Sequence, residues 1–101
     1  MPSQPQMAES ELQKAVTDMC KLFGLKWHHQ RYSIGSGAGW PDLTIAGRAL
    51  LFRELKRESG KVTPAQVNWG GWLIAAGQDW AVWRPLDLAS GRIRRELEAI
   101  R

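Results

Sequence analysis

The sequence predicts an α/β domain built around a mixed sheet of about four strands flanked by helices. Two observations lead to this prediction: three short strand-like segments follow a helical segment, and a second helix separates them from a fourth strand. Strands that follow one another directly tend to pair antiparallel, whereas a strand reached through a helical crossover lies parallel to its neighbour. We expect residues 1–101 to form a single domain, in which residues 1–6 are a flexible lead-in.

The first helix is predicted over residues 9–23. Its apolar residues recur at the i, i+3, i+4, i+7 spacing of a helix with one buried stripe. They are Leu12, Ala15, Val16, Met19, Cys20 and Phe23. Ser10 and Gln13 can form a capping box at the start, and Gly24 follows the end. Cys20 lies within the stripe, so we interpret it as a small buried hydrophobe and not as a catalytic group.

Three strands are predicted next. Residues 26–32 are short and aromatic and resemble a strand, and the glycine-rich residues 33–39 require a loop. Residues 43–45 and 49–56 then resemble two strands joined around residues 46–48, a length typical of a hairpin connection.

The second helix has a clear start at Thr63. Thr63 can cap it, Pro64 suits the first helical position, and Gln66 can close a capping box. The helix should run to about Ala76. The Gly70-Gly71 pair within it predicts close packing against another backbone, with a second subunit as one candidate.

The chain then returns to the sheet. Residues 79–83 resemble a buried strand ended by Pro85, and residues 93–101 a short basic C-terminal helix. The predicted element order is therefore α-β-β-β-α-β followed by a tail helix.

Composition narrows the class of protein. Fourteen Lys and Arg against ten Asp and Glu give a formal charge of +4, which permits nucleic-acid binding without demonstrating it. The single cysteine excludes an intramolecular disulfide, and no apolar run approaches the roughly 20 residues that span a bilayer. The N-terminal MPSQPQ is polar and unlike a secretory signal. We therefore expect a cytoplasmic protein with no membrane partner.

A group of polar residues gathers around the predicted hairpin. In an extended strand, alternate side chains share a face, so Glu54 and Lys56 project together. Asp42 ends the glycine-rich loop, where the partner strand can bring it beside Glu54. Two neighbouring carboxylates repel unless a cation lies between them, and their oxygens suit Mg²⁺ or Mn²⁺. Such an ion with a lysine beside it suits phosphodiester hydrolysis, because the lysine can orient and help deprotonate the attacking water.

Pro41-Asp42, eleven further residues and Glu54-Leu55-Lys56 form the motif of the PD-(D/E)XK nuclease superfamily, whose restriction-endonuclease-like core has the element order predicted above. Over roughly residues 9 to 88 the sequence also resembles the VRR-NUC branch of that superfamily. The segments that carry the resemblance are Glu11-Leu12-Gln13, Gly39-Trp-Pro-Asp-Leu43, Phe52-Arg-Glu-Leu-Lys-Arg57, Gly60-Lys-Val-Thr-Pro-Ala-Gln66, and Ala76-Gly77 before Ala81-Val-Trp-Arg84.

The resemblance implies a role for each residue of the site. Asp42 and Glu54 would hold the metal, Lys56 would serve the water, and Glu11 would complete the metal environment, with Glu9 as its competitor. The backbone carbonyl of Leu55 would be a further ligand. Gln66 would lie near the site, although its role as a capping residue is an equal alternative.

The resemblance also implies a substrate and a partner. Stand-alone phage and bacterial members of the family tend to be homodimers that cut branched DNA, such as four-way junctions or flaps. The candidate DNA contacts in this sequence are Arg31, Arg48, Arg57, Lys61 and Arg84 for phosphates and Trp40 for bases. Four other tryptophans, Trp69, Trp72, Trp80 and Trp83, are expected in the core. The alternative function is a non-catalytic DNA-binding module with a nuclease-like fold.

Overall fold

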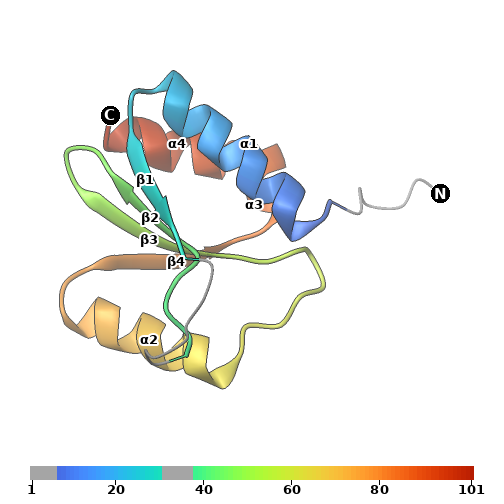
Figure 1. Cartoon of the computed structure of the whole chain (residues 1–101), viewed down its shortest axis with the longest axis vertical. Coiled ribbons are helices and arrows are strands. Elements are labelled where there is room, and N and C mark those ends of the chain that lie inside the picture. The colour runs from blue at the N-terminus through green and yellow to red at the C-terminus, as the bar shows by residue number, and fades with distance from the viewer. Residues whose placement is uncertain (1–6, 31–37) are drawn as a thin grey trace.

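The computed structural model describes residues 7–30 and 38–101, and it folds them into four helices and four strands (Figure 1). In chain order these are α1 (Glu9–Leu22), β1 (Lys26–His29), β2 (Leu43–Ala46), β3 (Leu50–Leu55), α2 (Pro64–Ala75), β4 (Asp79–Trp83), α3 (Pro85–Ala89) and α4 (Arg92–Ala99). The predicted lead-in, residues 1–6, lies outside the described residues, as does Arg31.

The four strands form one mixed sheet in the order β1-β2-β3-β4. β1, β2 and β3 pair antiparallel, and β4 lies parallel to β3. The predicted sheet is therefore confirmed, including the parallel strand that follows the helical crossover. Helices α1, α3 and α4 cover one face of the sheet and α2 covers the other (Figure 1).

The main core lies between the sheet and the helices α1 and α4. Strand register places alternate residues of β2 and β3 on this face, where they meet the predicted apolar stripe of α1. The buried members are Leu12, Val16, Cys20, Phe23, Leu25, Leu43, Ile45, Leu51, Leu55, Trp83, Ile93, Leu97 and Ile100. Burial raises the pKa of the Cys20 thiol to about 11, which agrees with its interpretation as a small hydrophobe and disfavours the reactive thiolate.

A buried arginine fastens α4 to this core. Arg53 is 1% exposed, and its Nη2 lies 2.7 Å from the Glu96 carboxylate and 2.9 Å from that of Asp79. Its guanidinium carbon also lies 5.0 Å from the ring centroid of Trp83. Because a buried charge that loses its partner costs about 3–5 kcal/mol, Arg53 and Glu96 together fix the position of the C-terminal helix.

The glycine pair of α2 has a different neighbour from the one predicted. A Cβ atom on Gly70 would lie 2.6 Å from Cε2 of the Trp80 indole, whereas one on Gly71 would meet nothing within 4 Å. The close packing is therefore against a side chain of β4 in the same chain, and it involves Gly70 alone. The predicted approach of another backbone was wrong, because the sheet presents an indole ring at this point.

Other local predictions need correction. The first helix is not capped by Ser10 and Gln13. Instead, Glu11 accepts a hydrogen bond from the Ala8 backbone N–H at 2.9 Å. The first strand ends at His29, and the short helix α3 after β4 was not predicted. Trp72 was expected in the core but is 59% exposed, because only Gly70 and Leu73 of α2 are buried. No described helix has the length and apolar character needed to cross a membrane.

Candidate active site

Asp42 and Glu54 meet on the face of the sheet that α2 covers. The register pairs Leu43 with Arg53, so the residue before Leu43 lies opposite the residue after Arg53. Because opposed residues of an antiparallel pair project to the same side, the two carboxyl groups become neighbours. The prediction that the hairpin brings Asp42 beside Glu54 therefore agrees with the strand register.

Glu54 is fully buried, with 0% of its surface exposed. Its Oε1 accepts a hydrogen bond from Nε2 of Gln66 at 2.9 Å, and its Oε2 has no hydrogen-bond partner among the described residues. Burial is the largest cause that raises the pKa of Glu54, followed by the neighbouring carboxyl group of Asp42 and its charge, and together they bring it to about 9. A buried carboxylate in this position is unstable without a positive partner.

Asp42 is anchored to the strand that carries Glu54. Its Oδ2 accepts a hydrogen bond from the backbone N–H of Leu55 at 2.8 Å. The chain just before Asp42 is constrained at Gly39, which has φ +97° and where a Cβ would collide with the backbone of Ala65. Only glycine combines that conformation with that close approach. Gly39 therefore packs against the first turn of α2, a few residues before Asp42 reaches β3.

Lys56 lies directly after the end of β3 and is half-buried. Its backbone N–H donates to the carbonyl of Trp83 at 3.0 Å. Its positive charge acts on Glu54, because it lowers the pKa of that carboxyl against the effects of burial and Asp42. The alternation predicted from the sequence thus brings the charge of Lys56 within electrostatic range of Glu54.

Gln66 serves both of the roles that its sequence position left open. Its Oε1 accepts a hydrogen bond from the backbone N–H of Thr63 at 2.9 Å, and its own backbone N–H donates to Oγ1 of Thr63 at 3.2 Å. This is the predicted capping box. The amide nitrogen at the other end of the side chain holds Glu54. The start of α2 therefore fixes the orientation of a site carboxylate.

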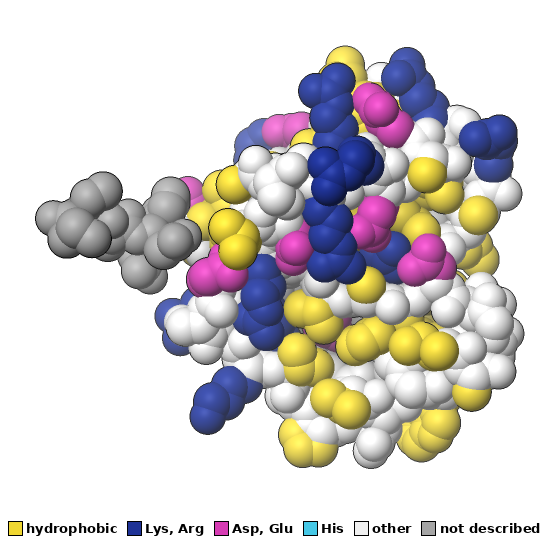
Figure 2. All heavy atoms as spheres, turned by 180° about the vertical axis from the view of Figure 1, so that it is seen from behind, with side chains coloured by type: hydrophobic (Ala, Val, Ile, Leu, Met, Phe, Trp, Pro, Cys, Tyr) yellow, Lys and Arg dark blue, Asp and Glu magenta, His cyan; other side chains and the backbone are white. Residues whose placement is uncertain are grey.

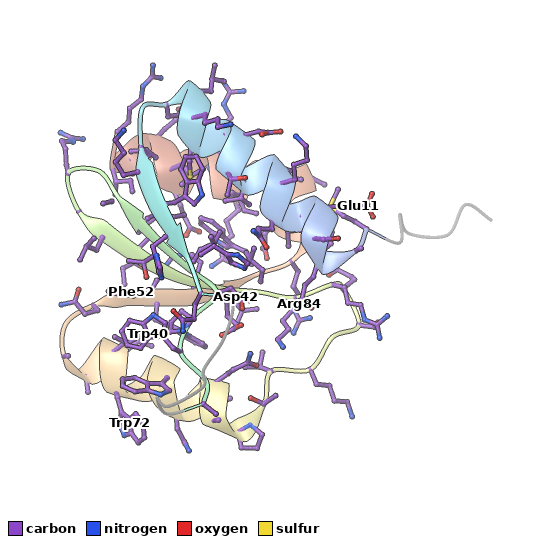
Figure 3. The ribbon with its side chains drawn as sticks, viewed as in Figure 1. Glu11, Trp40, Asp42, Phe52, Trp72 and Arg84 are labelled. Carbon is purple, nitrogen blue, oxygen red and sulfur yellow. The ribbon has the colours of Figure 1, made fainter. Side chains whose placement is uncertain are left out.

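A run of aromatic rings leads from this site to the outer surface of α2. Trp40 contacts Phe52 edge-to-face at 5.9 Å and Trp69 at 5.0 Å, and Trp69 contacts Trp72 at 5.1 Å. In Figure 3, Trp40 lies between Asp42 and Trp72. The run ends in the exposed indole of Trp72, within a helix that carries no charged residue.

Comparison with known proteins supplies the family of this fold. No protein-family model and no curated protein matches the sequence. One solved structure, described as a VRR_NUC domain protein, matches with a TM-score of 0.72 and 26% sequence identity, covering 92% of this chain and 90% of that one. The chain folds as a VRR-NUC domain. The resemblance stated from the sequence is thus confirmed, and the four-stranded mixed sheet is consistent with the PD-(D/E)XK core.

The VRR-NUC resemblance placed Glu11 in the site, but its carboxylate is used elsewhere. Glu11 caps its own helix through Ala8, and Figure 3 shows it at the outer end of α1. The first-helix carboxylate whose charge raises the pKa of Glu54 is Glu9. Both residues lie in the first turn of α1, so the sequence alone could not separate them. The electrostatic contribution favours Glu9.

The candidate phosphate contacts within the described residues fall into three groups. Arg57 and Lys61 are exposed in the segment that directly follows Lys56. Arg48 follows the end of β2, opposite the end next to Asp42, and its Nη2 donates to the Ala99 carbonyl at 3.2 Å. Arg84 does not point freely to solvent, because its Nη1 contacts three backbone carbonyls. Arg57 and Lys61 are therefore the better-placed cations.

The site has oxygen ligands of the kind that a hard cation requires, but only two carboxyl groups supply them. Asp42 and Glu54 offer carboxylate oxygens, and the unpartnered Oε2 of Glu54 is a buried acceptor with no donor among the described residues. Across residues 7–30 and 38–101, no group of three or more His, Cys, Asp and Glu side chains could by itself hold a metal ion. The residues fit a cation that takes two carboxylates and completes its shell with backbone carbonyl and water oxygens, which is usual for Mg²⁺.

Proposed function

We propose that this chain is a Mg²⁺- or Mn²⁺-dependent deoxyribonuclease, an endonuclease rather than an exonuclease. The observation that carries the proposal is the buried Oε2 of Glu54, which has no hydrogen-bond partner among the described residues. The same carboxyl group neighbours that of Asp42, and the charge of Lys56 acts on it. A fully buried carboxyl group with an unpartnered oxygen is costly for folding. Perturbed titratable groups of this kind are typical of catalytic sites.

The metal would be held by Asp42, Glu54 and the backbone carbonyl of Leu55, with Glu9 or Glu11 as a further carboxylate. When bound, such an ion neutralises charge on the phosphoryl oxygens and lowers the pKa of a water molecule. Asp42 is preorganised as a metal ligand, because the Leu55 N–H already fixes one of its oxygens. Gln66 does the same for Glu54, and leaves Oε2 available.

The protein's own residues would then act on the substrate in distinct ways. Lys56 would orient the attacking water, whose proton is made easier to lose by the bound ion, and its charge would stabilise the negative charge that develops on the phosphate. Arg57 and Lys61 would contact neighbouring phosphates and fix the register of the strand. All three lie in the segment between β3 and α2.

The proposed substrate is branched DNA, such as a four-way junction or a flap. The aromatic run from Trp40 to Trp72 supports this choice of substrate, because exposed indoles stack on unpaired bases of any sequence. We further propose a homodimer. The outer surface of α2 supports it, since its exposed side chains Val67 and Ile74 are apolar and its residues carry no charge that two copies would bring together. Apolar side chains gather over the lower part of the molecule, where α2 lies (Figure 2).

The test is a cleavage panel with matched variants. Wild-type protein with Mg²⁺ or Mn²⁺ is incubated with plasmid, flap, splayed-arm and four-way-junction DNA, beside Asp42→Asn, Glu54→Gln and the control Glu98→Gln on α4. We expect cleavage by the wild type and the control and a loss of roughly 100-fold or more in the two site variants. A wild-type protein that binds these DNAs but cuts none with either metal would establish the non-catalytic module instead. Solution mass measures the homodimer separately.

A further inference from the structure

Arg84 connects the ends of two neighbouring strands. It follows β4, and its Nη1 donates to the carbonyls of Arg57 at 2.9 Å, Glu58 at 3.1 Å and Gly60 at 2.7 Å. Since β3 and β4 are parallel neighbours, the segments that leave them emerge side by side. The guanidinium of Arg84 thus gathers the carbonyls of the turn that follows Lys56, where the chain of β3 departs from the sheet.

The same turn has two further tethers to the segment around Arg84. Oε2 of Glu58 accepts a hydrogen bond from the backbone N–H of Leu86 at 3.0 Å. At the other end, the backbone N–H of Lys56 donates to the Trp83 carbonyl at 3.0 Å. The turn from Lys56 to Gly60 is therefore bound to three residues of the β4–α3 segment, Trp83, Arg84 and Leu86. It needs these tethers, because its backbone carbonyls have left the β3 ladder.

The Arg57–Gly60 turn also supports the side chain of Lys56. A Cβ atom placed on Gly60 would lie 3.5 Å from Cδ of Lys56, so the aliphatic stem of the lysine runs along the turn. A lysine side chain otherwise has about 2 kcal/mol of rotamer entropy to lose on ordering. A fixed turn limits the directions in which the ammonium group can point.

We propose that Arg84 is a positioning residue: it holds the Arg57–Gly60 turn against Lys56 and thereby places the lysine ammonium beside Glu54. This inference rests on the proposed nuclease function, and it replaces the role of phosphate contact that the sequence predicted for Arg84. A guanidinium nitrogen that contacts three carbonyls has no remaining hydrogen for a phosphate oxygen. Nη1 is thus committed to the turn, and in this proposal Arg84 acts on the reaction through the turn.

Two variants with opposite charge changes separate positioning from phosphate binding. Arg84→Ala removes a positive charge and Glu58→Ala removes a negative one, but both remove hydrogen bonds that hold the same turn. The control is Arg94→Ala, which removes an arginine from α4 that pairs with Glu98 in an exposed ion pair. Because misplacing a catalytic group by about 1 Å costs on the order of 100-fold, we expect both turn variants to lose 10- to 100-fold in kcat, with KM and its salt dependence unchanged and the control unaffected.

Opposite results in the two variants would overturn the proposal. If Arg84 contacts phosphate, Arg84→Ala raises KM and flattens its salt dependence, while Glu58→Ala keeps or improves binding. Equal kcat values for Arg84→Ala and Arg94→Ala would also overturn it. Should Arg84→Ala fail to fold, Glu58→Ala alone decides by the same kcat criterion.

Amide hydrogen exchange makes the test independent of the proposed nuclease activity. If the wild type cleaves no DNA, the proposed function fails, but the exchange rates of the Lys56 and Gly60 amides still report on the turn. The proposal expects them to rise at least tenfold in Arg84→Ala and to stay unchanged in Arg94→Ala. Unchanged exchange in both variants would show that Arg84 does not hold the turn.

Discussion

The carboxylate of Asp42 is bonded to the backbone of Leu55, the residue that follows Glu54, at 2.8 Å. This bond crosses from the end of a loop to the middle of the sheet, and it fixes Asp42 relative to Glu54 without any cation. The neighbouring Glu54 is fixed by Gln66. The two carboxyl groups are thus held in place by the fold itself, and such preorganisation is what a reactive site requires.

The lysines of the β3–α2 segment should have separable roles. Lys56→Met is expected to lower kcat on the order of 100- to 10,000-fold, because it removes the charge beside the carboxylates and the group that orients the water. Lys61→Met should leave kcat nearly unchanged, raise KM and reduce the salt slope of DNA binding by about one. Steady-state kinetics at several salt concentrations measure both. Similar kcat losses in the two variants would contradict the assignment.

Stability without metal should fall as pH rises, because Glu54 has a raised pKa. Its pKa is about 9 in the folded protein against 4.5 for the free group. Between these values the folded state holds a proton that the unfolded state has released, so the free energy of unfolding decreases with pH. Denaturant unfolding in EDTA at pH 5 and pH 8 should show this loss in the wild type. Glu54→Gln should lack it, and identical pH slopes in the two proteins would refute the raised pKa.

Glu9 and Glu11 should differ in what their removal affects. Glu11→Ala is expected to cost about 1 kcal/mol of stability, because it removes the hydrogen bond that caps α1. Its Mn²⁺ affinity should stay that of the wild type. Glu9→Ala should weaken Mn²⁺ binding with little change in stability, since its charge acts on Glu54. Calorimetric titration with Mn²⁺ and thermal unfolding decide the matter, and weaker Mn²⁺ binding in Glu11→Ala alone would return Glu11 to the site.

The two adjacent glycines of α2 should respond in opposite directions to alanine. Gly71→Ala should stabilise the chain by about 0.5–1 kcal/mol, because the position is open and helical. Gly70→Ala should destabilise it by about 1–3 kcal/mol, because the new methyl group would overlap the Trp80 indole. Denaturant unfolding of the two variants provides the comparison. Equal effects would mean that Trp80 yields to the added methyl group.

Trp72 should matter for DNA with unpaired bases and not for plain duplex. Removing its exposed indole should weaken binding to a splayed arm by about 1–3 kcal/mol if one base stacks there. Leu22→Ala, a similarly exposed apolar position on α1, should have no effect. Fluorescence anisotropy in EDTA measures both variants against splayed-arm and duplex DNA. Equal losses on both DNAs, or a change of solution mass in Trp72→Ala, would indicate a dimer contact instead of a stacking site.

The sequence by itself determined the features that depend on local chemistry. The apolar stripe of α1, the Thr63 and Gln66 cap of α2 and the order of the strands all follow from periodicity and turn residues close in the chain. The shared face of Glu54 and Lys56 follows from strand alternation alone. Even the pairing of Asp42 with Glu54 needed only a hairpin of ordinary length.

Only the tertiary structure decided which partners the side chains have. Arg84 contacts carbonyls of another segment, Trp72 lies outside the core, and Glu11 caps a helix while the charge of Glu9 acts on Glu54. None of these outcomes follows from the neighbours in the sequence. Each depends on which elements pack together, because burial, charge and hydrogen bonding act through space and not along the chain.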